Sequence, residues 1–125
     1  SRREVHVSRD PRGVFTTAGS INGAPVSFLV DTGATAIVLN AGDAARAGVD
    51  YQRQGVRIGV RTASGTTSGY AVALRHVSVG DISLSDVRAV VLEGESPAMP
   101  LLGMSFLGRV KMRHEGAMLV LEQRP

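Results

Sequence analysis

The chain has 125 residues and a mass of 13.1 kDa, the size of one ordinary domain. With 43% hydrophobic residues, 20% charged residues and no cysteine, it can fill a globular core, which excludes a disordered chain, a disulfide scaffold and a thiolate metal site. Its formal charge of +3 comes from scattered residues rather than a basic run, and only 4% of residues are aromatic, so we expect no nucleic-acid partner.

We expect residues 1–14 to form an N-terminal strand or linker, followed by one domain over residues 15–125. The stretch begins Ser1-Arg2-Arg3-Glu4 without an apolar signal segment, and no apolar run approaches the roughly 20 residues that span a bilayer. Arg2 and Arg3 are typical of a polar linker that follows a membrane anchor or a cleavage point. Contact with a membrane is therefore expected only through an anchor that precedes this stretch.

The first elements are predicted to be a β-hairpin and a short helix. Asn22-Gly23 separates two apolar runs within Phe15–Val30, and both residues readily adopt the positive φ that a type I′ turn requires. After a further apolar run at residues 37–39, Asn40 can cap a helix over residues 41–47. Gly48 is placed to close that helix in the left-handed conformation.

Two more hairpins are predicted in the middle of the chain. Apolar residues alternate over residues 56–62, stop at the polar segment 63–66 and alternate again over residues 70–74. A third hairpin over residues 77–84 turns at Gly80-Asp81, where a leading glycine suits a type II′ turn. Both hairpins indicate antiparallel sheet.

The last third of the chain adds β-like runs and one brief helical turn. Residues 87–92, 110–113 and 118–121 read as strands, with a turn at Glu115-Gly116, and residues 102–107 read as a helical turn flanked by glycines. With 15 glycines and 5 prolines at the joints between short strands, a closed or folded-over β-barrel fits better than an α/β sheet. The predicted fold class is therefore mostly β, with one or two short helices.

One carboxylate interrupts the apolar pattern. Asp31 follows Val26–Val30 directly and precedes Thr32-Gly33-Ala34-Thr35. An ionised aspartate between buried strands is costly unless it is paired or hydrogen-bonded, and a threonine hydroxyl and a glycine N–H are suited to that task. Asp-Thr-Gly alone is better explained by a turn that opens at the aspartate, because three residues in this order can occur by chance.

With its flanks, this segment resembles the catalytic loop of retropepsin-like aspartic proteases, in particular their single-domain bacterial members. Three further segments follow in the family's order. Thr62-Ala63-Ser64-Gly65 resembles the tip of the flap hairpin that closes over substrate, Leu101-Leu102-Gly103 resembles the motif that supports the catalytic loop, and Met104–Arg109 resembles the helix after it. The matching segments lie within Phe15–Leu121, nearly the whole chain.

The resemblance implies an aspartic endopeptidase whose monomer is a retropepsin-like closed β-barrel and whose active form is a two-fold dimer. It implies no cofactor and a peptide or protein substrate. The implied catalytic residues are Asp31, Thr32 and Gly33, with Thr32 joining the two loops and Gly33 bringing its backbone N–H close to the carboxylate. The implied substrate-binding residues are Ala34, Thr62, Ala63, Ser64 and Gly65.

A second carboxylate is required, because peptide hydrolysis of this kind needs one group to activate water and another to protonate the carbonyl oxygen. No other aspartate stands in an apolar-Asp-Thr/Ser-Gly context; the remaining candidates are Asp10, Asp43, Asp50, Asp81 and Asp86. We therefore expect Asp31 to pair with Asp31 of a second copy across a two-fold axis. The terminal strands, residues 5–7 and 118–121, either interleave between copies or complete the monomer's own sheet.

Alternative functions remain open on the sequence alone. A catalytically latent retropepsin fold that binds peptides or mediates dimerisation is one, although a binding module has no chemical need of the costly Asp31. Weak nucleic-acid binding through arginines is less well supported. His6, His76 and His114 lack metal-ligand spacing, so we expect no metal. The family resemblance implies a location on the periplasmic or cell-envelope side of the membrane.

Overall fold

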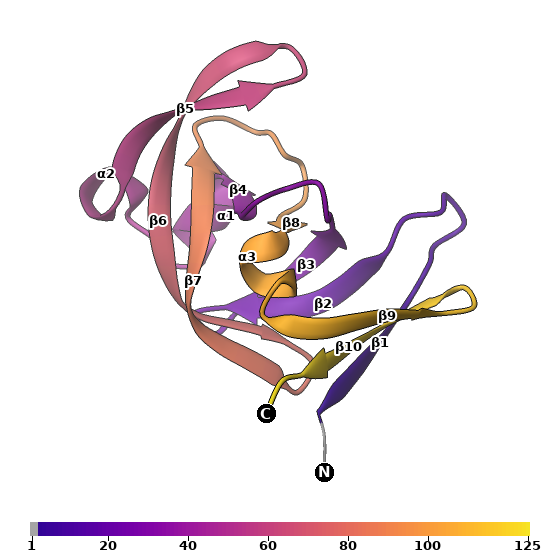
Figure 1. The fold of residues 1–125 in the computed structure, drawn as a ribbon. Coiled ribbons are helices and arrows are strands. Elements are labelled where there is room, and N and C mark those ends of the chain that lie inside the picture. The colour runs from indigo at the N-terminus through magenta and orange to yellow at the C-terminus, as the bar shows by residue number, and fades with distance from the viewer. Residues whose placement is uncertain (1–2) are drawn as a thin grey trace.

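The computed structural model describes residues 3–125, so Arg2 of the expected linker lies outside the described residues. Strands hold 58% of the chain and helices 11%, which confirms a mostly β fold (Figure 1). The elements in chain order are β1 (Glu4–Ser8), β2 (Thr16–Ile21), β3 (Ala24–Val30), β4 (Ile37–Asn40), α1 (Ala41–Arg46), α2 (Tyr51–Gln54), β5 (Val56–Thr62), β6 (Gly65–Val79), β7 (Ile82–Leu92), β8 (Leu101–Leu102), α3 (Met104–Leu107), β9 (Val110–Glu115) and β10 (Met118–Gln123).

Seven strands form one sheet in the order β2-β3-β8-β4-β7-β6-β5. The long strand β6 also pairs with β2 through residues 77–79, which brings the sheet back to its first strand (Figure 1). The sheet is therefore folded over, as the short strands and glycine-bearing joints predict. The pairs β3–β8 and β4–β7 are parallel. The short strand β8 lies between β3 and β4, both of which are distant from it in sequence.

The hydrophobic core fills the inside of this folded sheet. Burial alternates along β6, where Val72 and Leu74 are buried and Ala73 between them is exposed. Helix α3, within the predicted turn at residues 102–107, contributes the fully buried Phe106. Burying a side chain of this kind stabilises a fold by roughly 1.5–3 kcal/mol.

The predicted hairpin turns are confirmed. Asn22 and Gly23 join β2 to β3 with φ of 51° and 84°, the positive values that a type I′ turn requires. Gly80, the first turn residue between β6 and β7, has φ of 54°. The runs predicted as separate strands at residues 70–74 and 77–79 form one strand, because pairing with β7 continues past the exposed polar residues between them.

The three helices are short. Asn40 caps α1 as predicted, since its side chain accepts a hydrogen bond of 2.7 Å from the backbone N–H of Asp43, and Gly48 follows the helix with φ of 70°. No local signal predicts α2, because its single turn has no side-chain cap and buries no residue. Contact between the rings of Tyr51 and Tyr70, with centroids 5.2 Å apart, holds α2 against β6.

The two ends of the chain meet in a second sheet with the order β1-β10-β9. Strand β1 pairs with β10 of the same chain, so the described chain completes its own sheet. On this sheet Arg113 forms ion pairs with Glu4, Glu115 and Glu122. A hydrogen bond with His6 and the charge of Arg113 hold the pKa of the Glu4 carboxyl below its ordinary value.

Candidate active site

Asp31 stands at the end of β3, where the backbone leaves the sheet. Its backbone N–H donates to the carbonyl of Leu102 at 3.0 Å, which fixes the start of the loop on β8. One carboxylate oxygen, Oδ1, accepts a hydrogen bond of 2.9 Å from the N–H of Gly33. The Asp31 side chain is half-buried, so the loop presents a carboxylate that a second molecule can approach.

The segment from β8 into α3 packs against this loop and supports it. The N–H of Met104 donates to the carbonyl of Ala34 at 2.8 Å. At Gly103 the backbones approach so closely that an added Cβ would lie 2.2 Å from the carbonyl oxygen of Ala36 and 2.8 Å from that of Ala34. Only glycine fits this contact without displacing the loop. The apolar-apolar-glycine motif thus packs directly against the Asp-Thr-Gly loop.

Ser105 ties the far end of the loop to the neighbouring strand. Its hydroxyl oxygen accepts a hydrogen bond of 3.0 Å from the N–H of Ile37 and donates one of 2.7 Å to the carbonyl of Arg88. Sequence reasoning missed this role of Ser105, because its partners lie 68 and 17 residues away. A serine inside a predicted helical turn, two residues after the glycine of the apolar-apolar-glycine motif, is the one local signal that marks it.

We expect Ser105→Ala to lower both stability and turnover. It removes two hydrogen bonds, each worth about 0.5–1.5 kcal/mol, and leaves the N–H of Ile37 without its acceptor. Thermal unfolding measures the first effect, and steady-state cleavage kinetics should show a reduced kcat with a smaller change in KM. Ser105→Thr keeps the hydroxyl and should restore kcat, while Ser78→Ala, at an exposed serine pair, serves as the matched control.

The hairpin of β5 and β6 carries the four residues expected at a flap tip. Only Ala63 and Ser64 lie between the strands, because Thr62 pairs with Gly65, so the break is shorter than the predicted segment 63–66. The hydroxyl of Thr62 donates to the carbonyl of Gly65 at 2.8 Å, and Gly65 has φ of 125°. Figure 1 shows this hairpin projecting past the rest of the sheet. Within residues 3–125, no hydrogen bond joins its tip to the Asp31 loop.

An apolar pocket of about 340 Å³ opens beside the loop. Leu29 lines it two residues before Asp31, and Leu101, which pairs with Leu29, lies next to it. Arg12 stands at the same pocket and bonds to the carboxylate of Asp10 at 2.8 Å. This bond holds the pKa of the Asp10 carboxyl below its ordinary value. The pocket can receive an apolar side chain close to the carboxylate.

Within residues 3–125, Asp31 has no second carboxylate bonded to it and Thr32 has no hydrogen-bond partner. Thr32 is exposed, and its hydroxyl makes no hydrogen bond within the described chain. No ion pair or hydrogen bond among residues 3–125 joins Asp31 to a second carboxylate; the other aspartates lie at Asp10, Asp43, Asp50, Asp81 and Asp86, outside the loop. Nor do the described residues contain a group of three or more histidine, aspartate or glutamate side chains that could hold a metal ion.

A folded β-sheet that presents an Asp-Thr-Gly loop over an apolar-apolar-glycine segment defines the class of retropepsin-like aspartic proteases. The chain belongs to the family described as gag-polyprotein putative aspartyl protease, whose family model matches residues 17–109.

Two curated relatives match most of this chain. It is 34% identical over 111 residues to an uncharacterised protein in the cobV 5′ region of Sinorhizobium sp, which covers 89% of this chain and 48% of the relative. It is 31% identical over 108 residues to the uncharacterised protein RP867 of Rickettsia prowazekii, which covers 86% of this chain and 46% of the relative. The chain thus spans about half the length of these relatives.

Solved structures share the fold. The crystal structure of a retropepsin-like aspartic protease from Rickettsia conorii matches with a TM-score of 0.84 and 29% identity, covering 98% of this chain and 92% of that chain. EIAV protease complexed with the inhibitor HBY-793 matches with a TM-score of 0.58 and 24% identity, covering 74% of this chain and 84% of that one. The second likeness concerns the fold alone.

Proposed function

We propose that this chain is an aspartic endopeptidase that hydrolyses peptide bonds as a homodimer, with water activated between two Asp31 carboxyl groups. The observation that carries the proposal is the loop of Asp31, Thr32 and Gly33 at the end of β3, supported by Gly103 and Ser105. The carboxylate is half-buried and already accepts one backbone hydrogen bond, so it is held in place before substrate binds.

The reaction requires the two carboxyl groups in different protonation states. Two carboxyl groups that face each other share one proton, because like charges so close cannot both ionise. The ionised Asp31 takes a proton from water, whose oxygen attacks the peptide carbonyl carbon, while the protonated Asp31 gives its proton to the carbonyl oxygen. The resulting diol returns a proton to one carboxylate as the amide nitrogen gains one, and the C–N bond breaks.

A dimer supplies what one chain lacks. Each chain carries one Asp-Thr-Gly loop, and the exposed Thr32 beside Asp31 leaves this surface available to a second loop. A two-fold axis through the loops would bring Asp31 next to Asp31 of the partner subunit. The Thr32 hydroxyl, which has no partner within the described chain, is then free to bond across the axis.

The substrate is proposed to bind as an extended strand. Among residues 3–125, strand β5 pairs with β6 alone, so the other edge of β5 offers unpaired backbone groups to a peptide. The tip residues Thr62, Ala63, Ser64 and Gly65 would act as the flap, and the pocket beside Leu29 would take an apolar side chain.

Among the described residues no helix is long and apolar enough to cross a membrane. The location in the cell envelope stays a prediction.

Cleavage of a mixed peptide library tests the proposal. The chain is incubated with the library across a pH series and at several protein concentrations, and the products are identified by mass spectrometry. We expect cleavage at apolar residues, with a rate that rises faster than linearly with protein below the dimer dissociation constant. Absence of cleavage in a sample shown to be dimeric by sedimentation would contradict the proposal and favour the peptide-binding alternative.

A further inference from the structure

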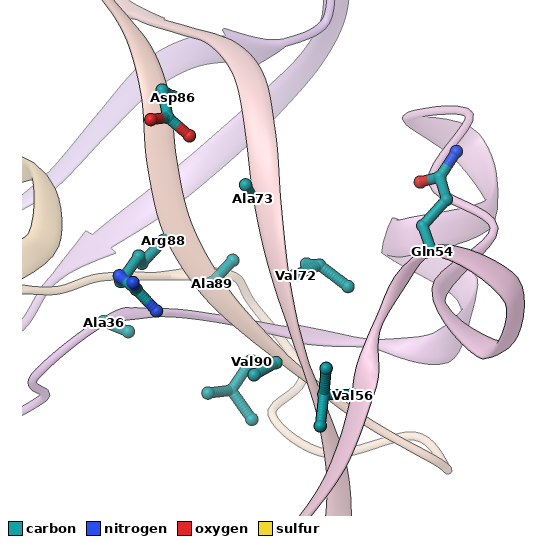
Figure 2. Close-up of a pocket in the computed structure, with 10 residues that line it drawn as sticks. Ala36, Gln54, Val56, Val72, Ala73, Asp86, Arg88, Ala89 and Val90 are labelled. Atoms are coloured by element: carbon teal, nitrogen blue, oxygen red, sulfur yellow. The ribbon is translucent and has the colours of Figure 1, made fainter.

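A second cavity, of about 370 Å³, lies on the face of β5, β6 and β7 that points away from the core. We call it the outer pocket, and its characteristic residues are Ala36, Val56, Ala73, Asp86, Arg88 and Val90 (Figure 2). None of the expected catalytic or substrate-binding residues lines the outer pocket.

The hollow exists because alanines stand where longer side chains would fill it. Ala71 lies opposite both Val56 and Val90 in the sheet, and Ala73 lies opposite Arg88. The floor is therefore made of methyl groups, with longer side chains on either side. Val56 is 69% exposed, so one wall presents apolar surface that a ligand can cover.

The outer pocket is tied to the catalytic loop. Ala36 lines it and follows Asp31 by five residues, so the two Cα atoms are at most about 18 Å apart. Ser105 bonds both to the carbonyl of Arg88 in the pocket and to the N–H of Ile37 in the loop. The chain therefore limits the separation of Ala36 and Asp31, and about five residues of extended peptide can span that distance.

A two-residue repeat runs along the part of β7 that lines the outer pocket. Val90 and Arg88 occupy alternate positions, and alternate residues of an extended peptide repeat at the same spacing of about 6.6–7 Å. Asp86 lies two residues before Arg88, where β7 departs from extended backbone with φ of 54°. No ion pair engages Arg88 or Asp86 within residues 3–125. Arg109 donates to the carbonyl of Asp86 at 3.2 Å and so holds the strand in place there. The pair Val90 and Arg88 is complementary to a peptide with an apolar and an acidic residue at alternate positions.

We propose that the outer pocket binds a distal segment of the peptide substrate, four to eight residues from the scissile bond, where Arg88 selects an acidic side chain. The inference rests on the proposed function, since it names a substrate class for the same site. Ala36 lines the outer pocket, and its carbonyl packs against Gly103 beneath the catalytic loop. A peptide that extends from the catalytic loop into the outer pocket would pass this residue. The two-fold axis of the dimer gives one such pocket on each side of the cleft.

Extended peptides test the proposal. A short peptide that the chain cleaves is lengthened on either side, and Glu, Gln or Lys is scanned through positions four to eight from the scissile bond. We expect Glu at one position to raise kcat/KM about three- to tenfold over Gln, with rates referred to the unextended peptide. Arg88→Glu should transfer that preference to Lys, whereas Arg124→Glu, the same change at an exposed terminal position, should keep the preference for Glu.

A variant that fills the outer pocket provides a second test of the proposal. Ala73→Leu places a larger side chain on the floor and should abolish the gain from extension. An unchanged preference for Glu in both Arg88→Glu and Ala73→Leu would overturn the proposal. So would a changed dimer dissociation constant in Arg88→Glu without a changed peptide preference, because the pocket would then be a contact between copies.

A binding measurement separates this proposal from the proposed function. If wild-type protein cleaves none of the peptides, fluorescence anisotropy of a labelled peptide with Glu at positions four to eight still reports occupation of the outer pocket. Weaker binding to Arg88→Glu and Ala73→Leu than to Arg124→Glu would support the distal site while the endopeptidase fails. Equal binding to all three variants would overturn the distal site.

Discussion

Replacing Asp31 by Asn should lower kcat/KM for peptide cleavage by about 10³-fold or more, because the amide neither accepts a proton from water nor gives one to the carbonyl oxygen. The side chain keeps its shape, and its oxygen can still accept the hydrogen bond from Gly33, which is 2.9 Å long in the wild type. We therefore expect little change in thermal unfolding. Cleavage of the best library peptide, measured beside circular dichroism, separates loss of chemistry from loss of fold.

Asp81→Asn is the matched control for this change. Asp81 lies exposed in the turn between β6 and β7, outside the catalytic loop and both pockets. The same carboxylate-to-amide replacement there should leave kcat/KM within about twofold of wild type, as surface changes usually do. Residual activity in Asp31→Asn equal to that of Asp81→Asn would contradict a catalytic role for Asp31.

Gly103→Ala should damage both the fold and the reaction. An added Cβ would lie 2.2 Å from the carbonyl oxygen of Ala36, so either α3 or the catalytic loop must move. Overpacking of this kind costs about 1–3 kcal/mol of unfolding free energy, and a loop displaced by about 1 Å can lose 10²-fold in rate. Chemical denaturation and steady-state kinetics on the same sample measure the two effects.

Gly42→Ala makes the same chemical change where it is tolerated. Gly42 lies in α1, and an added Cβ would meet its nearest neighbours at an ordinary 3.5 Å. Because alanine favours a helix over glycine by up to about 1 kcal/mol, this variant should be slightly more stable than wild type. If Gly103→Ala unfolded at the same denaturant concentration as Gly42→Ala, the close packing of the loop on Gly103 would be wrong.

The features that the sequence predicts well are those set by a few neighbouring residues. Asn22-Gly23 specifies its own turn through the φ values that these two residues tolerate, and Asn40 caps its helix through a contact three residues away. The position of Asp31 directly after an apolar strand likewise predicts the loop from a local pattern. The order of the motifs along the chain then gave the family.

The features that escaped prediction depend on contacts between distant residues. Strand β6 continues past Leu74 because β7 pairs with it on both sides of residue 75, which no property of residues 75–76 reveals. Ser105 gains its role from Ile37 and Arg88, far away in sequence. The outer pocket exists because Ala36 and Ala73 come together only after the sheet has folded over.

The central claim is that two copies of Asp31 make one active site, and mixing wild type with Asp31→Asn tests it most directly. Wild-type protein is held above the dimer dissociation constant and equilibrated with a ninefold excess of Asp31→Asn before peptide is added. Random pairing leaves only about one tenth of the wild-type chains in wild-type dimers, so cleavage should fall to about a tenth. The same excess of Asp81→Asn should instead raise cleavage. Cleavage that excess Asp31→Asn leaves unchanged or raises would mean that a single Asp31 suffices, and would contradict the shared site.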